Sequence, residues 1–157
     1  MTGAIDDNSG TGSSDRRAAM CVLALAPAEQ LVRAADALGT LPSHEILRGP
    51  ETGLVMVRGR AGGGGDAFNL GEVTVTRCTV KLATGEVGHA YITGRDGEKA
   101  KLAATLDGML QRNENRADVE ARVIAPLAEG IAASDRTRTA EAEKTKVDFF
   151  TMVRGDD

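Results

Sequence analysis

Arginines that flank a run of glycines are the residues of this sequence best suited to chemistry, and that chemistry is the binding of an anion. Residues 54–60 (LVMVRGR) read as a strand in which Arg58 and Arg60 point the same way, because side chains alternate between the two faces of a strand. The glycines that follow can bring several backbone N–H groups onto one oxyanion. Arg95 lies where a later strand should end and a helix begin, so it could reach an anion near the positive helix terminus. The candidate anion or phosphate contacts are Arg58, Arg60, Gly62, Gly63, Gly64, Gly65 and Arg95.

Plainer interpretations of the same residues stay open. The glycine run has neither the lysine and hydroxyl ending of a Walker loop nor the spacing of a dinucleotide-binding fingerprint. A long hairpin connection, or a loop that contacts a partner, also explains it. Arg95 is also explained by a surface ion pair with Asp96 or Asp66.

Groups that could carry out catalysis or bind a metal are scarce. His89 falls among apolar residues of a predicted strand, where a core or interface role is favoured over that of a general base or metal ligand. Cys21 and Cys78 form no closely spaced pair, so two reduced thiols are favoured over a disulfide. We recognise no nucleophile with a neighbouring base and no motif of paired carboxylates. We therefore expect no catalytic residue and no metal site made by this chain alone.

The elements that must position these residues indicate an α+β fold. Apolar and β-branched runs separated by glycines are typical of strands and turns. The sequence predicts an antiparallel β-sheet of about four strands, flanked by N- and C-terminal helices. The predicted strands include residues 44–48, 54–60, 73–80 and 89–92.

The turn between the last two strands sets their register. If Thr84 and Gly85 form a two-residue turn, Cys78 lies opposite Tyr91 and Val80 opposite His89 on the apolar face. The other face of the sheet is then exposed to solvent or contacts a partner. It carries Arg77, Thr79 and Lys81.

Prolines, glycines and capping residues mark the helices. Ser14 or Asp15 can cap a first helix, and Pro27 should interrupt it and start a second that stops at Gly39. Asp96 is the natural N-cap of a helix with apolar residues at helical spacing. Pro126 should break and restart the last helix, which leads into a charged, solvated run at residues 134–146.

Length and charge limit the class of protein. The 157 residues suit a single domain, which we place at residues 15–157 after a disordered tail at residues 1–14. The net charge of −4 argues against nucleic acid and against an anionic membrane as partners. We find no apolar run long enough for a membrane span and no secretory signal, and we expect a cytoplasmic protein.

The C-terminal segment, residues 147–157, changes character abruptly after the charged run. It is apolar and prone to form a strand, and it holds two of the three phenylalanines of the chain. Such a segment has to be buried, either on the domain's own sheet or on a partner. The candidate interface residues are Phe149, Phe150, Met152 and Arg154.

Four blocks of the sequence together resemble a known family. They are ETGLV at residues 51–55 with the glycine run after it, GRD at 94–96, IAPL at 124–127 and VDFFTMVRG at 147–155. In these blocks the chain is similar to PhnG, the G subunit of the bacterial carbon–phosphorus lyase system. The similarity runs from about Asp15 to the end, and the C-terminal block is its most specific part.

The resemblance implies a non-catalytic subunit of the carbon–phosphorus lyase core complex. Proteins of this family act with the I, H and L subunits to make alpha-D-ribose 1-methylphosphonate 5-triphosphate from ATP and an alkylphosphonate, with release of adenine. The family's G, H, I and J subunits form the core assembly, and the J subunit later breaks the carbon–phosphorus bond. By this resemblance ATP is a substrate of the complex, this chain alone binds no cofactor, and its partners are the I, H, J and L subunits.

Other function classes compete with this interpretation. A stand-alone transferase or hydrolase could bind a nucleotide or another anion through the glycine run and the arginines. A regulatory ligand-binding domain unrelated to phosphonates fits the expected fold but not the resemblance.

Overall fold

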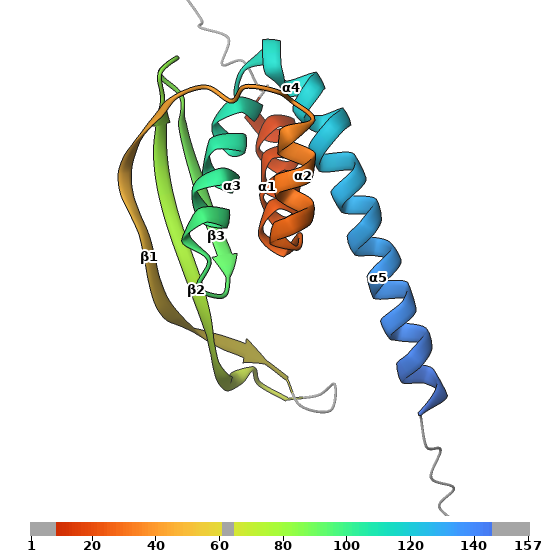
Figure 1. Ribbon diagram of the computed structural model, residues 1–157. Helices are drawn as coiled ribbons and strands as arrows, with labels where there is room; N and C mark the ends of the chain where they lie inside the picture. Colours follow the sequence, from red (N-terminus) through yellow and green to blue (C-terminus); the bar gives the residue numbers. More distant parts are fainter. Residues whose placement is uncertain (1–8, 61–64, 146–157) are drawn as a thin grey trace, which may run out of the picture.

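A three-stranded antiparallel sheet lies on one side of the molecule, and the helices cover one of its faces (Figure 1). The computed structural model describes residues 9–60 and 65–145, with their side chains from Asp15 onward. The predicted α+β class is confirmed. The elements are α1 (Ser9–Leu25), α2 (Ala28–Asp36), β1 (His44–Gly59), β2 (Phe68–Leu82), β3 (Val87–Thr93), α3 (Gly97–Leu110), α4 (Asn113–Val119), the π-helical turn η1 (Glu120–Ile124) and α5 (Ala125–Lys144).

The described sheet has three strands, where the sequence predicted about four. The predicted strands 44–48 and 54–60 are one strand, β1, of 16 residues. We expected residues 49–53 to be a turn, but the chain continues through them with register shifts on either side of Arg48. Pro50 is tolerated because β1 is an edge strand, whose outward backbone groups need no partner in the sheet.

The register between β2 and β3 differs by one residue from the predicted one. The loop has three residues, Ala83 to Gly85, because Leu82 N–H donates to the Glu86 carbonyl at 2.9 Å and Gly85 has φ of +106°. Cys78 therefore pairs with Ala90, and Thr79 pairs with His89.

A shift of one residue moves every side chain of a strand to the other face. The prediction that His89 lies among apolar neighbours was wrong, and so was the one that placed Tyr91 beside Cys78. Both lie on the exposed face of β3, whereas Ala90 and Ile92 are buried beneath the helices. The predicted outward face of β2, formed by Arg77, Thr79 and Lys81, is confirmed.

Helix α3 is the centre of the hydrophobic core. The Asp96 carboxylate accepts a hydrogen bond from Lys99 N–H at 2.9 Å, which confirms the predicted N-cap. The sheet comes unusually close to this helix at Gly88, where a Cβ atom would lie 1.9 Å from the Ala104 carbonyl oxygen. The largest fully buried side chains around α3 are Leu23, Leu31, Val80, Leu82, Ile92, Leu106, Val119 and Val123.

The N-terminal helices form the predicted helix–break–helix. Helices α1 and α2 meet at an angle of 118° at Pro27, and Leu31 and Ala35 face the core as expected. Helix α1 begins at Ser9, upstream of the N-cap that we expected at Ser14 or Asp15. Residues 9–14 of the expected tail belong to α1. Residues 1–8 lie outside the described part, so disorder there stays a prediction.

Among the described residues, no single helix combines the length and the apolar character that a membrane crossing requires. Helices α1 and α2 meet that criterion only when they are counted together across their bend.

The last helix is continuous, so the predicted break at Pro126 was wrong. The turn η1 carries a wide i to i−5 hydrogen bond from Ala125 N–H to the Glu120 carbonyl. A proline ring clashes with the i−4 carbonyl of a regular helix, and this single widened turn directly before Pro126 lets the helix bend and continue. Beyond Ile131 every described residue of α5 is exposed, as expected for the charged run, and the helix leaves the body (Figure 1).

Candidate functional site

The predicted anion contacts lie at two different places. Arg58 and Arg60 lie at the end of β1 that leads into the glycine run, of which Gly62, Gly63 and Gly64 are outside the described residues. The Arg58 guanidinium donates a hydrogen bond to the Ala67 carbonyl at 3.0 Å, so it ties the two sides of this hairpin together. Gly65 is exposed beyond that contact.

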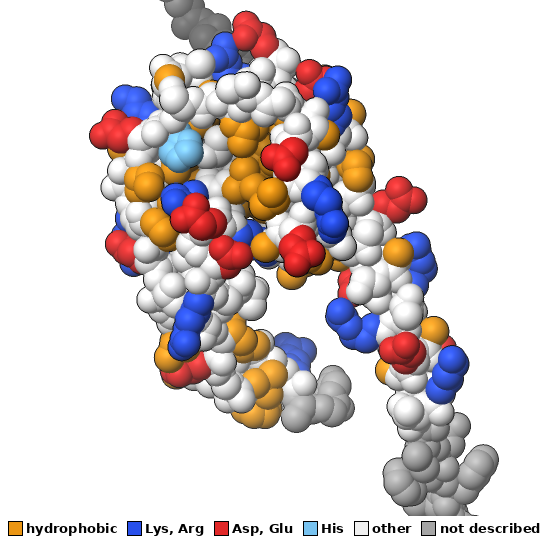
Figure 2. Space-filling model, viewed as in Figure 1, with side chains coloured by type: hydrophobic (Ala, Val, Ile, Leu, Met, Phe, Trp, Pro, Cys, Tyr) orange, Lys and Arg blue, Asp and Glu red, His pale blue; other side chains and the backbone are white. Residues whose placement is uncertain are grey.

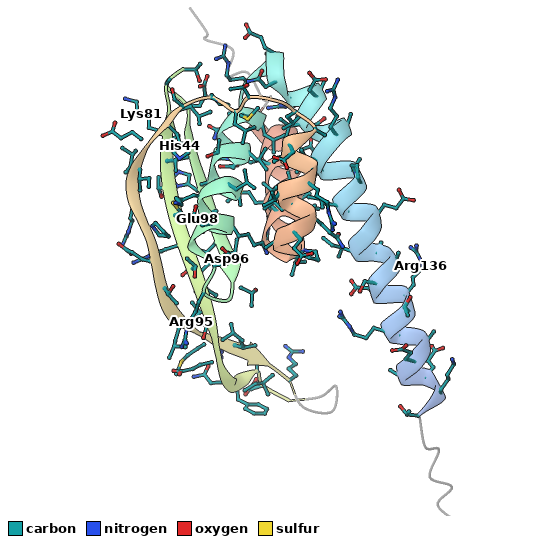
Figure 3. The ribbon with its side chains drawn as sticks, viewed as in Figure 1. His44, Lys81, Arg95, Asp96, Glu98 and Arg136 are labelled. Carbon is teal, nitrogen blue, oxygen red and sulfur yellow. The ribbon has the colours of Figure 1, made fainter. Side chains whose placement is uncertain are left out.

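Arg95 lies between β3 and α3, next to the capping residue Asp96 (Figure 3). The preceding Gly94 N–H donates to the Thr74 carbonyl at 2.8 Å, and Thr74 pairs with Leu54. The four residue steps from Leu54 to Arg58 span about 13 Å of strand. The ion pair with Asp96 or Asp66 that we considered for Arg95 is not found among the described residues. A role in anion binding therefore stays a prediction, both for Arg58 and Arg60 with the glycine run and for Arg95.

A cluster of opposite charges occupies the sheet face away from the helices. The Glu51 carboxylate accepts hydrogen bonds from Arg77 Nε at 2.9 Å and from Arg48 Nε at 3.3 Å. The hydrogen bond from Arg77, helped by the charges of both arginines, holds the pKa of Glu51 below its ordinary value. Glu51 and Arg77 border a depression of about 210 Å³ that Tyr91 also lines. The sequence analysis missed this cluster because Glu51 and Arg77 meet only through the register of two strands.

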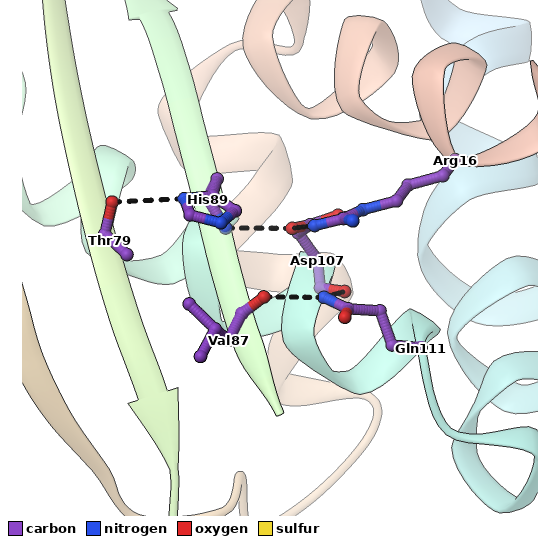
Figure 4. Close-up of polar contacts among 6 residues, drawn as sticks. All are labelled: Arg16, Thr79, Val87, His89, Asp107 and Gln111. Carbon is purple, nitrogen blue, oxygen red and sulfur yellow. Dashed lines mark hydrogen bonds and ion pairs between the residues drawn. The ribbon is translucent and has the colours of Figure 1, made fainter. Parts of the chain in front are cut away.

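Asp107 on α3 is the most deeply buried charged side chain of the described residues. Its carboxylate, with an exposed fraction of 0%, accepts two hydrogen bonds from the Arg16 guanidinium, at 2.9 and 2.7 Å (Figure 4). It also accepts one from the backbone N–H of His89 at 2.8 Å. One turn further along α3, Gln111 Nε2 donates to the Val87 carbonyl at 2.8 Å. This network joins α1, α3 and β3.

Asp107 and Gln111 satisfy two backbone groups on the free edge of β3, the N–H of His89 and the carbonyl of Val87. In an antiparallel pair, only every second residue of a strand forms backbone hydrogen bonds with the adjacent strand. Counting from the hydrogen-bonded pair of Leu82 and Glu86, the residues of β3 that bond to β2 include Gly88 and Ala90. The backbone groups of Val87 and His89 therefore point away from β2. Asp107 of α3 and the C-cap residue Gln111 take the place of a neighbouring strand there, so the network is explained by the structure of the sheet edge.

The contact between the His89 ring and a hydroxyl group lies outside any catalytic arrangement that we recognise. His89 Nδ1 lies 3.2 Å from Thr79 Oγ1 on the exposed face of the sheet. Asp107 touches the backbone of His89 and not its ring, so the three residues do not form a nucleophile, base and orienting acid. The ring therefore has no orienting carboxylate among the contacts that the structure describes.

The cysteines occupy different surroundings, and neither forms part of a metal site in the described ranges. Cys21 is exposed and borders an apolar cavity of about 240 Å³ between α1 and β3. Cys78 is buried, and this burial raises the pKa of its thiol. Within residues 9–60 and 65–145, no three His, Cys, Asp or Glu side chains are placed to hold a metal ion.

Comparison with known proteins identifies the family of this chain. The sequence model of a family described as "Phosphonate metabolism protein PhnG" matches residues 14–155. The chain belongs to the PhnG family. It is also 49% identical, over 157 residues and the full length of both chains, to the protein of Rhizobium meliloti (strain 1021) named "Alpha-D-ribose 1-methylphosphonate 5-triphosphate synthase subunit PhnG".

Membership of the PhnG family confirms the resemblance read from the sequence. The family match begins at Ser14 and includes the C-terminal block at residues 147–155, as expected. The candidate interface residues of that block lie outside the described part of the chain, so their role stays a prediction. They are Phe149, Phe150, Met152 and Arg154.

Proposed function

We propose that this chain is a subunit, without catalytic residues of its own, of alpha-D-ribose 1-methylphosphonate 5-triphosphate synthase in phosphonate metabolism. The observation that carries the proposal is the 49% identity, from end to end, with a relative that is named as the PhnG subunit of that synthase. The match covers all of both chains, so it includes every surface through which such a subunit could meet its partners.

The structure supports a role in assembly. The reaction inferred from the resemblance displaces adenine from ATP by a phosphonate, and it needs groups that hold a triphosphate and stabilise a leaving base. In the described residues Asp107 pairs with Arg16, and Glu51 pairs with Arg77, so these charged groups bind each other. We therefore assign the chemistry to partner chains, with ATP as a substrate of the complex.

The proposed partners are the I, H and L subunits for synthesis of the triphosphate, and the J subunit within the core assembly. We place this hetero-oligomer in the cytoplasm. The anion contacts at Arg58, Arg60 and Arg95 would serve it by extending a phosphate-binding surface completed by a partner.

The C-terminal segment is the proposed contact with the I subunit. Helix α5 carries the chain away from the sheet as far as Lys144 (Figure 1). Deletion of residues 147–157 should abolish co-purification with the I subunit. Undiminished assembly after this deletion would refute the proposed contact.

Reconstitution tests the function directly. The G, H, I and L subunits are purified, and adenine release from ATP and methylphosphonate is measured with each subunit omitted in turn. We expect no adenine from this chain alone, full activity from the complete set and loss of activity when this chain is left out. Adenine release or nucleotide hydrolysis by the single chain would favour the stand-alone transferase or hydrolase instead.

A further inference from the structure

Beyond the three-stranded part of the sheet, strands β1 and β2 continue together as a two-stranded ribbon. Strand β3 ends at Thr93, which pairs with Val75, and Val75 pairs with Gly53 on its other side. The part of β1 and β2 past this level, residues 54–59 and 68–74, is named the arm. Figure 1 shows the arm extending past the ends of the helices that cover the rest of the sheet and bending toward the side of the sheet on which they lie.

The arm exposes apolar side chains on both of its faces. Leu54 and Met56 share one face and are 62% and 63% exposed, and Val57 and Val73 are exposed on the other. Phe68 and Leu70, near its end, are 49% and 56% exposed. In the space-filling view, apolar side chains gather at the end of this ribbon (Figure 2).

Specific contacts hold the arm in shape. Besides the bond from Arg58 to Ala67, Asn69 Nδ2 lies 3.4 Å from Met56 Sδ across the two strands. The register shift between Val57 and Arg58 makes Leu70 a bulge, and Leu70 packs over Gly59, where a Cβ atom would lie 2.5 Å from Leu70 Cδ1. Bulges of this kind bend and twist a ribbon at a defined position.

A ribbon of this kind is unstable in water without a cover. An isolated pair of strands is at best marginally stable, and clustered apolar side chains on the surface of a monomer mark an interaction site. Unpaired strand edges add to the cost, because they expose backbone groups that pair readily with other chains. The arm has such an edge on each strand in the described sheet.

We propose that the arm inserts into an apolar groove of a different subunit of the synthase, which covers both of its faces. This inference rests on the proposed function, which supplies such a subunit. Only Arg58 and Glu72 of the arm are charged, and they balance. The arm therefore offers no net charge to nucleic acid or to an anionic membrane, and its complement is an uncharged protein groove. A second copy of this chain, packed on a two-fold axis, would cover one face of the arm and leave the other in water.

Paired variants test the arm. Leu54→Thr with Met56→Thr keeps β-prone residues in place but removes the apolar surface, and Leu25→Gln with Val32→Gln is a control at exposed apolar residues outside the arm. We expect the arm variant to bind the other subunits at least about tenfold more weakly, as for loss of central interface residues. The control should bind as the unchanged chain does. Unchanged binding by the arm variant would overturn the proposal.

A second measurement does not depend on how the variant folds. A photoreactive benzoylphenylalanine replaces Phe68 in the arm or Val32 on α2, and the assembled complex is irradiated. We expect a cross-link from position 68 to another subunit and none from position 32. A cross-link to a second copy of this chain, or none, would overturn the proposal.

The outcomes for the arm and for the proposed function can be told apart. If omission of this chain abolishes adenine release while the arm variant assembles and position 68 gives no cross-link, the function stands and the arm proposal falls. If the unchanged chain binds no other subunit, both fall.

Discussion

The Asp107 carboxylate and the Arg16 guanidinium form a two-bonded ion pair, with bonds of 2.9 and 2.7 Å, between residues 91 positions apart in the sequence. The carboxylate is fully buried on α3, whereas the Arg16 side chain is 36% exposed on α1. Because the same carboxylate also binds the backbone of β3, it fixes two helices and a sheet edge relative to one another. It therefore shapes the body from which the arm and α5 project.

Removal of either partner of this pair should destabilise the fold. Removing one partner of a buried ion pair lowers the free energy of unfolding by about 3–5 kcal/mol. Because Arg16 is partly exposed, solvent screens this pair, and we expect a loss of about 2–4 kcal/mol for Arg16→Ala or Asp107→Ala. Arg138→Ala breaks the exposed pair with Asp135 and should cost less than about 0.5 kcal/mol. Urea unfolding measures all three, and equal costs for Arg138→Ala and Asp107→Ala would contradict this account.

Strand β3 lies so close to α3 at Gly88 that no side chain should be tolerated at this position. Its Cβ would lie 1.9 Å from a backbone carbonyl, which no side-chain rotation can relieve. We expect Gly88→Ala to cost about 3 kcal/mol, at the upper end for overpacking. Gly53→Ala in β1 meets no atom within 4 Å and should stay within about 0.5 kcal/mol of the unchanged chain. Thermal unfolding compares the two, and a mild effect at Gly88 would mean that the elements are not held so closely.

The cysteines should differ in reactivity. Burial raises the pKa of Cys78 and keeps its thiol protonated, whereas Cys21 is exposed. Under native conditions we expect iodoacetamide to modify Cys21 and to reach Cys78 only after unfolding. Peptide mass spectrometry locates the modification, and Cys21→Ser is the control. Rapid labelling of Cys78 in the folded Cys21→Ser variant would show that the core opens readily.

Local signals predicted local structure well in this chain. The N-cap at Asp96 and the break at Pro27 could be read from a few neighbouring residues, and both are found. Where the outcome depended on a partner strand or on a helix as a whole, prediction was wrong. An edge position allows Pro50 within β1, a three-residue loop shifts the register of β3, and a π turn carries the helix past Pro126.

The candidate site shows the same limit. Asp107 stands out in the sequence as a charge among apolar residues of a helix, yet its partner Arg16 is too distant in the chain for any spacing rule to find. The arginines and glycines proposed for anion binding can all donate hydrogen bonds to an anion. The strand register nevertheless places Arg95 and Arg58 apart. Sequence can therefore nominate such groups, while their grouping depends on long-range pairing.

The charge cluster at Glu51 should respond to pH in a defined direction. Its pKa is lowered in the folded chain, chiefly by the hydrogen bond from Arg77, so the contribution to stability is present above the ordinary carboxylate pKa. That contribution is lost as the pH falls through the lower, folded value. Arg77→Leu should raise the pKa of Glu51, which a carbon-detected NMR titration measures. An unchanged titration would mean that the pair does not persist in solution.

If Arg95 contacts the triphosphate within the assembled synthase, its loss should weaken substrate binding more than assembly. We expect Arg95→Gln to raise the KM for ATP about tenfold, because one charge-assisted hydrogen bond contributes roughly 1.5 kcal/mol. Arg136→Gln is the matched control, since Arg136 is an exposed arginine on the outer part of α5, away from Arg95 (Figure 3). Arg58→Gln tests the other candidate place, where the guanidinium already binds the Ala67 carbonyl. Equal KM values for Arg95→Gln and Arg136→Gln, with assembly intact, would exclude Arg95 from the anion site.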